Sequence, residues 1–394
     1  MKPKRLLIFL GLVLWLFPNY AVSQDSAAKL IEIIEGVQHP NRQGLDPFSL
    51  AELMERFGVP GVSIAVIKDF KLHWAKGYGT ADVETGAKVN TETLFQAASI
   101  SKPLNAMAIL KAVQDGRFSM DQDINTILKS WKLPESPFTE NQPVTPRMLA
   151  SHVSGLGDGF GFPGYSPSAP RPTTVQILNG EKPSNVGSVF LARRPMTAFQ
   201  YSGGGVTVLQ LVLTDVIGRP YSEILQEYVL GPIGMTQSTF EQPLPPERDK
   251  NATRAHDHKG QARDVKWHVY PELAAAGLWT TPTDLAKFAI EVQKSLRGEA
   301  NNVLSQTMTR EMLSPVGVGD YAVGFAVTKE GQGWYFSHNG GNWGFKCALV
   351  AHKVKGYGFA IMTNSQNGRI ITNELKERIE RAYGFDSLDK PLLR

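Results

Sequence analysis

Strand-forming segments lie at the two ends of this chain, and this placement limits its possible folds more than any other feature. Near the start, residues 62–67 form a β-branched run of strand length, and residues 71–78 read as its antiparallel return. Strand patterns return only late, at residues 321–328, 344–352 and 357–362. The long middle has helical periodicity, so the sheet must be assembled from both chain ends.

The resulting prediction is an α+β fold (an α/β sandwich), in which helices flank an antiparallel sheet and a mainly helical subdomain is inserted. We expect one domain over residues 24–390, with an α/β part at about 24–98 and 265–390 and a helical part at about 99–264. The main helices are predicted at residues 101–113, 206–217 and 222–230, from residue 282 with Thr283 as N-cap, and at 371–383. With 42% hydrophobic residues, the chain can bury a core of this size.

The first residues carry a targeting signal. Lys2, Lys4 and Arg5 precede an unbroken apolar run over residues 6–17, and Ala21-Val22-Ser23 supplies the small residues that a signal peptidase reads. The apolar run is shorter than the roughly 20 residues of a membrane span. We therefore predict a cleaved signal peptide over residues 1–23, a periplasmic or secreted protein, and no stable membrane anchor after cleavage near Ser23.

Several functional classes lack their sequence signals. Charged residues make up 20% of the chain without a long run of one sign, so no nucleic-acid partner is predicted. The G-x-S-x-G and H-E-x-x-H motifs are absent, and the single cysteine, Cys347, is expected in the core and excludes an internal disulfide. His256 and His258 lie in a polar segment, where solvated histidines are far commoner than metal ligands. We expect neither a metal nor an organic cofactor.

The strongest chemical signal is Ser99-Ile100-Ser101-Lys102. If Ser99 opens a helix, Lys102 lies one turn later on the same face, within reach of the hydroxyl. Pro103 fits this placement because proline is tolerated in the first turn of a helix. A serine becomes a good nucleophile only when a base removes its proton, and a desolvated lysine can do this or assist another base. Taken alone, Ser99 is better explained as a simple N-cap.

Two later segments complete a pattern. Tyr201-Ser202-Gly203 lies beside a glycine-rich turn, and His338-Asn339-Gly340-Gly341 enters a late strand. Each element also occurs elsewhere, at Ser26-Ala27-Ala28-Lys29, Tyr165-Ser166, Tyr221-Ser222 and His258-Lys259-Gly260. Only the set at residues 99–102, 201–203 and 338–341 combines a helix-opening serine, a tyrosine beside glycines and an H-x-G motif at a strand.

In this order the motifs resemble those of the serine β-lactamase and penicillin-binding protein-like family. The resemblance is to its class C side, which includes D-alanyl-D-alanine carboxypeptidases, D-aminopeptidases and β-lactamase-like esterases. It covers about residues 50–383 and extends to the stretches 60–66, 145–156 and 275–285. The resemblance implies the fold of this family.

The resemblance also implies a role for each motif residue. Ser99 is the acylated nucleophile, Lys102 tunes it by proton exchange and charge, and Tyr201 is the base that activates first Ser99 and later the deacylating water. His338 stands where many relatives have lysine and is expected to hydrogen-bond Tyr201 or the substrate. His152 is expected to be structural and to hold the turn behind the site.

The substrate-binding residues implied by the resemblance are Gly203, Asn339, Gly340 and Gly341, and the N–H groups of Ser99 and Gly341 are expected to form the oxyanion hole. Two departures from the family pattern limit the substrate. Gly203 replaces the asparagine of a Y-x-N motif, whose amide contacts the substrate. The H-N-G sequence replaces K-T-G, which removes a permanent cation and a hydroxyl suited to a carboxylate. Both changes lean away from efficient β-lactamase activity and leave esterase or peptidase activity open.

The leading hypothesis is an exported serine hydrolase that forms a Ser99 acyl-enzyme with a small-molecule ester, amide or peptide. The alternatives are a D-alanyl-D-alanine carboxypeptidase or D-aminopeptidase, a weak β-lactamase, and a non-catalytic sensor that keeps the penicillin-binding fold. The glycine- and proline-rich segment 157–172 is either a long surface loop or a lip over the pocket. The sequence leaves the oligomeric state open.

Overall fold

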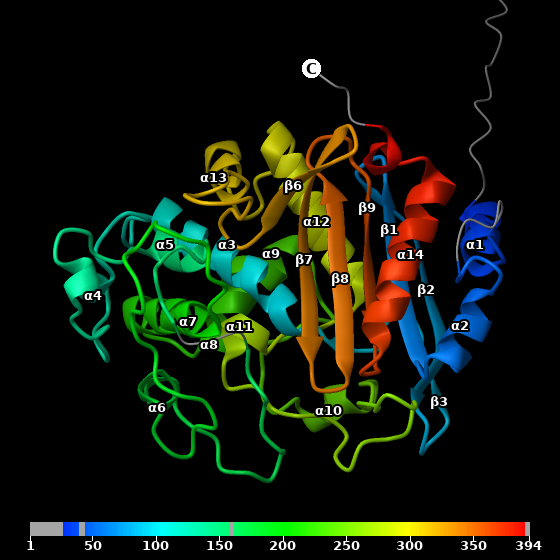
Figure 1. The fold of residues 1–394 in the computed structure, drawn as a ribbon, viewed down its shortest axis with the longest axis horizontal. Helices are drawn as coiled ribbons and strands as arrows, with labels where there is room; N and C mark the ends of the chain where they lie inside the picture. Colours follow the sequence, from blue (N-terminus) through cyan, green and yellow to red (C-terminus); the bar gives the residue numbers. More distant parts are fainter. Residues whose placement is uncertain (1–26, 39–43, 158–160, 391–394) are drawn as a thin grey trace, which may run out of the picture.

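The centre of the molecule is a seven-stranded antiparallel sheet with the strand order β3-β2-β1-β9-β8-β7-β6 (Figure 1). The computed structural model describes residues 27–38, 44–157 and 161–390, so the predicted signal peptide lies outside the described residues. The strands are β1 (Gly61–Lys68), β2 (Lys71–Asp82), β3 (Ala87–Lys88), β6 (Ala326–Glu330), β7 (Gly333–Asn342), β8 (Phe345–His352) and β9 (Gly358–Thr363). β1 pairs with β9, which confirms that the sheet is built from both chain ends.

Helices cover both faces of this sheet, which confirms the predicted α+β class. α14 (Gly368–Tyr383) packs on β8 and β9 and contacts α1 (Ala27–Glu35), which lies beside α2 (Leu50–Arg56). α12 (Pro282–Arg297) packs on the other face against β1, β2 and β9.

The two helical layers explain why β1 reads as a continuous apolar run. Val62, Ile64 and Val66 belong to the core beneath α14, whereas Ala65 and Ile67 belong to the larger core on the opposite face. A strand that is buried on both faces has no solvent-facing positions, so its sequence does not alternate.

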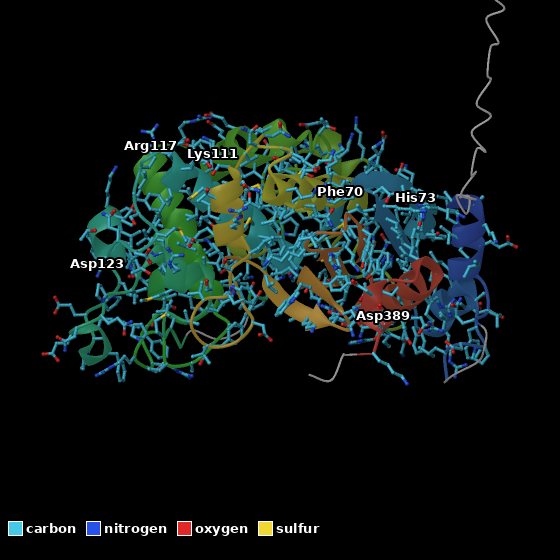
Figure 2. All side chains as sticks on the ribbon, turned by 90° about the horizontal axis from the view of Figure 1, so that it is seen from above. Phe70, His73, Lys111, Arg117, Asp123 and Asp389 are labelled. Atoms are coloured by element: carbon cyan, nitrogen blue, oxygen red, sulfur yellow. The ribbon has the colours of Figure 1, made fainter. Side chains whose placement is uncertain are left out.

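The helical part is inserted between two short strands, β4 (Phe95–Gln96) and β5 (Trp279–Thr280), which pair with each other. Its helices are α3 (Ser101–Gln114), α4 (Ile124–Ile127), α5 (Pro146–Ala150), α6 (Thr174–Asn179), α7 (Gly203–Ile217), α8 (Tyr221–Leu225), α9 (Gly231–Ile233), α10 (Pro246–Asp249) and α11 (Leu273–Ala276). Seen from above, this part carries Lys111, Arg117 and Asp123, while Phe70 and His73 lie on the sheet side (Figure 2). Among the residues that the structure describes, no helix is long and apolar enough to cross a membrane.

Several predicted boundaries are corrected by the structure. The N-cap of α12 is Thr281 and not Thr283, because Pro282 takes the first helical position, where its fixed φ is favourable. The strand predicted from Tyr321 begins only at Ala326, since Gly324 has a φ of +86° and interrupts the extended chain. The segment predicted as one helix at 222–230 is α8 followed by a π-helical turn, Gln226–Leu230.

β7 also differs from the expectation. It begins at Gly333, so that His338 lies in the middle of the strand and not at its start. β7 pairs with β8 from Tyr335 to Asn342 but with β6 only from Gly333 to Ser337. The segment from His338 to Asn342 is therefore not covered by β6. β7 instead packs against the short turn Ala98–Ile100, which precedes α3.

Candidate active site

Ser99 lies in a 3₁₀ turn, Ala98–Ile100, that runs directly into α3. Ala98 has a φ of +50°, a left-handed conformation that is costly for a residue with a side chain and is common at functional sites. The hydroxyl of Ser101 fixes the turn, since it donates to Ala98 O at 2.6 Å and accepts from Leu278 N at 3.0 Å. The sequence thus holds Ser99 at a strained helix start, one turn from Lys102.

β7 packs directly against this turn. A Cβ atom on Gly340 would collide with Ala97 O and Cys347 Sγ, so only glycine allows the strand to approach this closely. The buried Cys347 thiol donates to Ala97 O at 2.9 Å, as expected for a core cysteine. The neighbouring Gly341 is exposed, and a Cβ atom there would lie 3.4 Å from the side chain of Lys346, in ordinary van der Waals contact.

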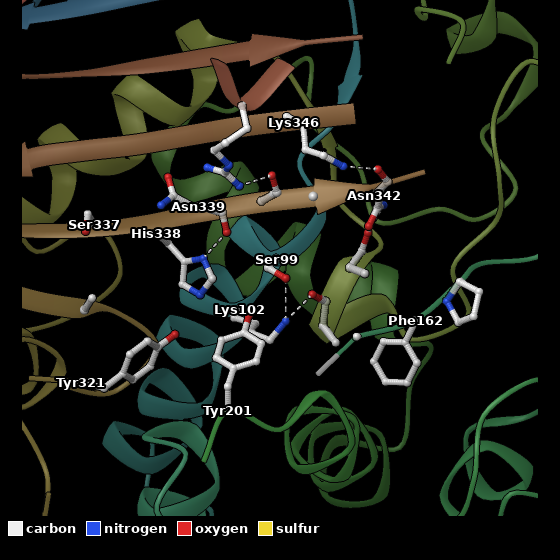
Figure 3. A pocket seen from close by; sticks show the side chains of 18 residues that line it. Ser99, Lys102, Phe162, Tyr201, Tyr321, Ser337, His338, Asn339, Asn342 and Lys346 are labelled. Carbon is white, nitrogen blue, oxygen red and sulfur yellow. Dashed lines mark hydrogen bonds between the residues drawn. The ribbon is translucent and has the colours of Figure 1, made fainter. Parts of the chain in front are cut away.

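Lys102 is almost completely buried, with 4% of its surface exposed, and points at Ser99 (Figure 3). Its Nζ donates to Ser99 Oγ at 3.0 Å and to Ala275 O at 2.8 Å. The ammonium also lies 4.9 Å from the centre of the Tyr201 ring. The carbonyl of α11 therefore fixes a buried cation between the serine hydroxyl and the tyrosine ring.

His152 holds the segment that carries Tyr201. Its carbonyl accepts from Gln200 N at 2.8 Å, its Nδ1 accepts from Ser202 N at 3.1 Å, and its ring lies 4.3 Å from that of Tyr201. Burial, together with Lys102 and His338, holds the pKa of His152 well below its usual range. The ring is therefore neutral and carries its proton on Nε2. The structural role predicted for His152 is a clamp on both chain neighbours of Tyr201.

His338 faces the same space as a neutral hydrogen-bond acceptor. Its Nδ1 lies 2.6 Å from Asn339 O, and because a carbonyl only accepts, this nitrogen carries the proton. Burial and Lys102 lower the pKa of His338 to about 3. Its Nε2 is buried and has no hydrogen-bond partner among the described residues. Of the two predicted partners, Tyr201 and the substrate, Nε2 is thus available to a substrate, and also to water.

A cavity of about 720 Å³ connects these groups. Ser99, Lys102, Tyr201 and His338 line it together with Asn339, Gly340 and Gly341, so seven of the eight residues predicted from the motifs meet there. Figure 3 shows Ser99 near its middle, with Tyr321 and His338 on one side and Phe162 on the other.

Gly203 is the predicted site residue that the described lining does not include. It opens α7, and the ring of Phe162 covers it: a Cβ on Gly203 would lie 2.7 Å from Phe162 Cε2. Phe162 itself lines the cavity, so this described part of the segment 157–172 forms a lip beside the nucleophile.

Eleven of the 18 lining residues were not among the predicted site residues, and four of these have large side chains: Tyr321, Phe162, Lys346 and Arg369. Burial raises the pKa of Tyr321 well above its usual range, and its hydroxyl donates to Gly324 O at 3.3 Å. None of the four belongs to a short motif, and only Phe162 lies in a segment, 157–172, that was considered as a possible lip over the pocket.

The competing histidine cluster does not form a site with these residues. His256 is buried and its Nδ1 lies 2.9 Å from Asn364 O, whereas His258 is exposed. Within the described ranges, no three His, Cys, Asp or Glu side chains gather in a way that could hold a metal ion.

Comparison with known proteins places these observations in a family. Residues 49–380 match the family model described as Beta-lactamase. Protein flp of Staphylococcus aureus (strain MW2) is 25% identical over 327 residues, which cover 79% of this chain and 61% of flp. An uncharacterized protein, MT1414, of Mycobacterium tuberculosis is 27% identical over 261 residues, which are 61% of this chain and 64% of that protein. The chain thus spans about three-fifths of the length of these curated relatives.

Solved structures share the fold at lower identity. The octameric penicillin-binding protein homologue from Pyrococcus abyssi superposes with a TM-score of 0.70 at 24% identity, covering 86% of this chain and 76% of that one. D-amino acid amidase from Ochrobactrum anthropi SV3, complexed with L-phenylalanine amide, gives a TM-score of 0.68 at 22% identity, covering 90% and 98%. These likenesses confirm the predicted fold.

Proposed function

Since the chain belongs to the Beta-lactamase family, we propose that it is an exported serine hydrolase that forms an acyl-enzyme at Ser99 with a small ester or amide. The observation that carries this proposal is the hydrogen bond of 3.0 Å from Lys102 Nζ to Ser99 Oγ. Burying a charge is costly. A buried ammonium directed at a serine is therefore not expected where that serine serves only as a helix cap.

In the proposed reaction, Ser99 Oγ attacks the carbonyl carbon and its proton passes to the phenolate oxygen of Tyr201, whose ring is held beside the Lys102 ammonium. The carbonyl oxygen becomes an oxyanion, which the N–H groups of Ser99 and Gly341 stabilise. Collapse of this intermediate releases the alcohol or amine, which takes the proton back. Water then repeats the sequence on the acyl-enzyme and regenerates Ser99.

The neutral His338 has a place in both steps. Its Nε2 can accept a hydrogen bond from the leaving group or from the attacking water, but it cannot donate one while Nδ1 holds the proton. This property distinguishes it from the lysine that it replaces, which only donates. A neutral acceptor suits an alcohol or amine leaving group better than a carboxylate.

A second candidate is a peptidase or amidase for D-amino acid substrates, that is, a D-alanyl-D-alanine carboxypeptidase or D-aminopeptidase. It is favoured by the likeness to D-amino acid amidase, which covers 98% of that chain, and to the structure named SurE with D-Leu, which has a TM-score of 0.67 at 22% identity. A weak β-lactamase and a non-catalytic sensor are the remaining alternatives.

The test is to incubate the purified protein with a p-nitrophenyl ester, a D-alanyl-D-alanine peptide and a chromogenic cephalosporin while following turnover and intact mass. We expect ester turnover with a transient adduct on Ser99, and a loss of at least about 10³-fold in Ser99→Ala. Ser166→Ala, in the decoy motif Tyr165-Ser166, is the matched control. Release of D-alanine would select the second candidate. Absence of turnover and adduct with all three would leave the sensor.

Export is tested separately. Expression of the full chain in a bacterial host, followed by N-terminal sequencing of the periplasmic and secreted fractions, should give a mature protein that begins after Ser23. Recovery of the uncleaved chain in the cytoplasm would contradict this part of the proposal.

A further inference from the structure

A hydrogen-bond acceptor and a hydrogen-bond donor lie close together in the wall of the cavity. The acceptor is His338 Nε2, which is buried and has no partner among the described residues. The donor is the hydroxyl of Tyr321, whose ring lies edge-on to that of His338 with 6.1 Å between the ring centres. Figure 3 shows this hydroxyl directed toward the space between His338 and Tyr201. The proposed reaction gives Tyr321 no role.

The ring of Tyr321 is fixed, whereas its hydroxyl proton is held only weakly. The rings of His152 and Phe199 pack against the buried Tyr321 ring, with 4.8 and 5.6 Å between the ring centres. The hydroxyl donates to Gly324 O at 3.3 Å, which is longer than the usual distance of about 2.5–3.0 Å between two oxygens in a hydrogen bond. The proton can therefore turn to a better acceptor while the ring stays in place.

The Tyr321 hydroxyl remains a donor throughout the proposed reaction. Burial raises its pKa well above the usual range, and a negative charge on Tyr201 raises that pKa further. Tyr321 therefore keeps its proton while Tyr201 is the phenolate base. His338 Nε2, in contrast, can only accept, because Nδ1 holds the proton of the neutral ring.

These groups match the hydrogen bonds of one water molecule. Such a water donates one proton to the Tyr201 phenolate and the other to His338 Nε2, and it accepts a hydrogen bond from the Tyr321 hydroxyl. The three contacts occupy three of the four directions around the water oxygen. The fourth direction, a lone pair, is left for the carbonyl carbon that Ser99 holds. A buried site with two to four polar partners is the kind of site that binds an ordered water.

We propose that His338 and Tyr321 bind the water that deacylates Ser99. The inference rests on the proposed function of the same site. The water oxygen bonds to the acyl carbon while one of its protons passes to Tyr201. The bond from this carbon to Ser99 Oγ then breaks, and Oγ takes the proton. The products are the free serine and a carboxylic acid.

The experiment measures acylation and deacylation separately. p-Nitrophenyl acetate is the substrate, because p-nitrophenolate leaves as a stable anion and needs no proton from the enzyme. Stopped-flow release of p-nitrophenolate gives both rates, and intact mass follows the adduct on Ser99. We expect deacylation to slow about tenfold in Tyr321→Phe and about 10²-fold in His338→Leu, while acylation changes by less than about threefold. The initial burst should then approach one p-nitrophenolate per enzyme.

Further variants distinguish hydrogen bonding from packing. His338→Gln retains a side-chain acceptor and should deacylate faster than His338→Leu. His338→Lys places a donor at this position, so the water loses an acceptor and the acyl-enzyme should accumulate.

Tyr221→Phe is the matched control for Tyr321→Phe. Tyr221 is also buried and its hydroxyl donates to Asn105 Oδ1 at 3.0 Å, but it is not among the described lining residues of the cavity. Both rates should be unchanged in this control. The inference would be overturned by equal slowing of acylation and deacylation in Tyr321→Phe, or by unchanged deacylation in Tyr321→Phe or His338→Leu.

A crystal structure of Ser99→Ala tests the water site without turnover. We expect an ordered water within about 3.2 Å of both His338 Nε2 and Tyr321 Oη. If the wild-type protein takes no adduct, the proposed function fails and deacylation fails with it, whereas this structure still supports or overturns the water site. If the adduct forms but no water lies between the two groups, the proposed function stands and the inference alone is wrong.

Discussion

Two clusters along β7, one near its start and one at its middle, contain similar side chains and differ in one charged group. The active-site cluster consists of Lys102, Tyr201 and His338 with Tyr321 and His152. The second, here named the Asp386 cluster, joins Asp386 to Tyr335, Tyr357, Lys355 and His352. Each has two tyrosines, a lysine and at least one histidine, but among the residues that the structure describes only the second has a carboxylate.

The carboxylate satisfies its surroundings. Asp386 accepts from the hydroxyls of Tyr335 and Tyr357 at 2.5 and 2.6 Å and from Lys355 Nζ at 2.5 Å. In the active-site cluster, the Nε2 atoms of His338 and His152 are buried without a partner among the described residues. His352 Nε2 in the Asp386 cluster makes no hydrogen bond either, but it lies 3.3 Å from a carboxylate oxygen of Asp386. A satisfied network stabilises the fold, whereas buried groups that lack a partner can meet a substrate. The difference between stabilising and reactive chemistry thus lies in one side chain.

The largest expected effect is a difference in kcat between variants of Lys102 and Lys355. Lys102→Met should lower kcat by about 10⁴-fold, because the serine and tyrosine lose the cation between them, and it should not lower stability, because a buried charge without a counter-ion is costly. Lys355→Met should leave kcat unchanged and cost at most about 1 kcal/mol, because that lysine is half exposed. Ester turnover and urea unfolding of both variants measure this contrast. Comparable activity in the two variants would contradict the predicted difference between the two lysines.

The second prediction is the opposite case, a loss of stability without a loss of activity. Asp386→Asn should reduce the free energy of unfolding by about 2 kcal/mol, because two tyrosine hydroxyls and a half-exposed ammonium lose their charged acceptor. It should leave the ester kcat at the wild-type value. Urea unfolding measures the change, with the exposed Asp389→Asn as the matched control. A loss of activity without a loss of stability would show that the two clusters are not independent.

The third prediction concerns pH: each cluster should lose its contribution to stability over a different pH range. The pKa of His338 is lowered to about 3 and that of His152 is also far below its usual range, so the unfolded chain binds more protons as the pH falls below about 6.5. Their contribution to stability is therefore present at neutral pH and is lost between about pH 6.5 and 3. The pKa of Asp386 is lowered to about 2 by Lys355 and the two tyrosines despite its burial, so its contribution is lost only between about pH 4 and 2.

Substitutions show which residues cause the loss of stability in each pH range. His338→Gln and His152→Asn should flatten the fall in unfolding free energy between about pH 7 and 5, and Asp386→Asn should flatten only the fall at lower pH. Asparagine at 152 retains an acceptor near Ser202 N and tolerates the φ of +58° found there. Urea titrations at each pH provide the measurement. An unchanged slope in both histidine variants would contradict the assignment of neutral buried histidines.

The sequence predicts the parts of this site that local geometry determines. Ser99 and Lys102 are one helical turn apart, so their contact follows from helix periodicity alone. The meeting of both chain ends in one sheet followed from the order of strand patterns, and β1–β9 pairing confirms it. Phe162, Lys346 and Arg369 could not be predicted, because loop packing, strand register and helix placement bring them to the cavity.

The partner of His338 shows a similar limit. The family resemblance suggested a bond to Tyr201 or to the substrate, yet Nδ1 donates to the adjacent Asn339 O in the folded chain. A local carbonyl competes with a distant side chain, and the sequence alone does not show which bond forms. The proton on Nδ1, and with it the acceptor at Nε2, became visible only with the strand in place.

The smallest expected effect concerns the decoy motif His258-Lys259-Gly260, which matches the H-x-G pattern as well as His338 does. His258 lies on an exposed turn, its Nδ1 is 3.1 Å from Asn367 Oδ1, and it does not line the cavity. His258→Ala should therefore change the free energy of unfolding by no more than about 0.5 kcal/mol and leave ester turnover unchanged. His338→Ala, measured in parallel, should lower turnover. Equal losses in the two variants would mean that burial beside Lys102 does not distinguish a reactive histidine from a solvated one, and the contrast between satisfied and unsatisfied groups would lose its basis.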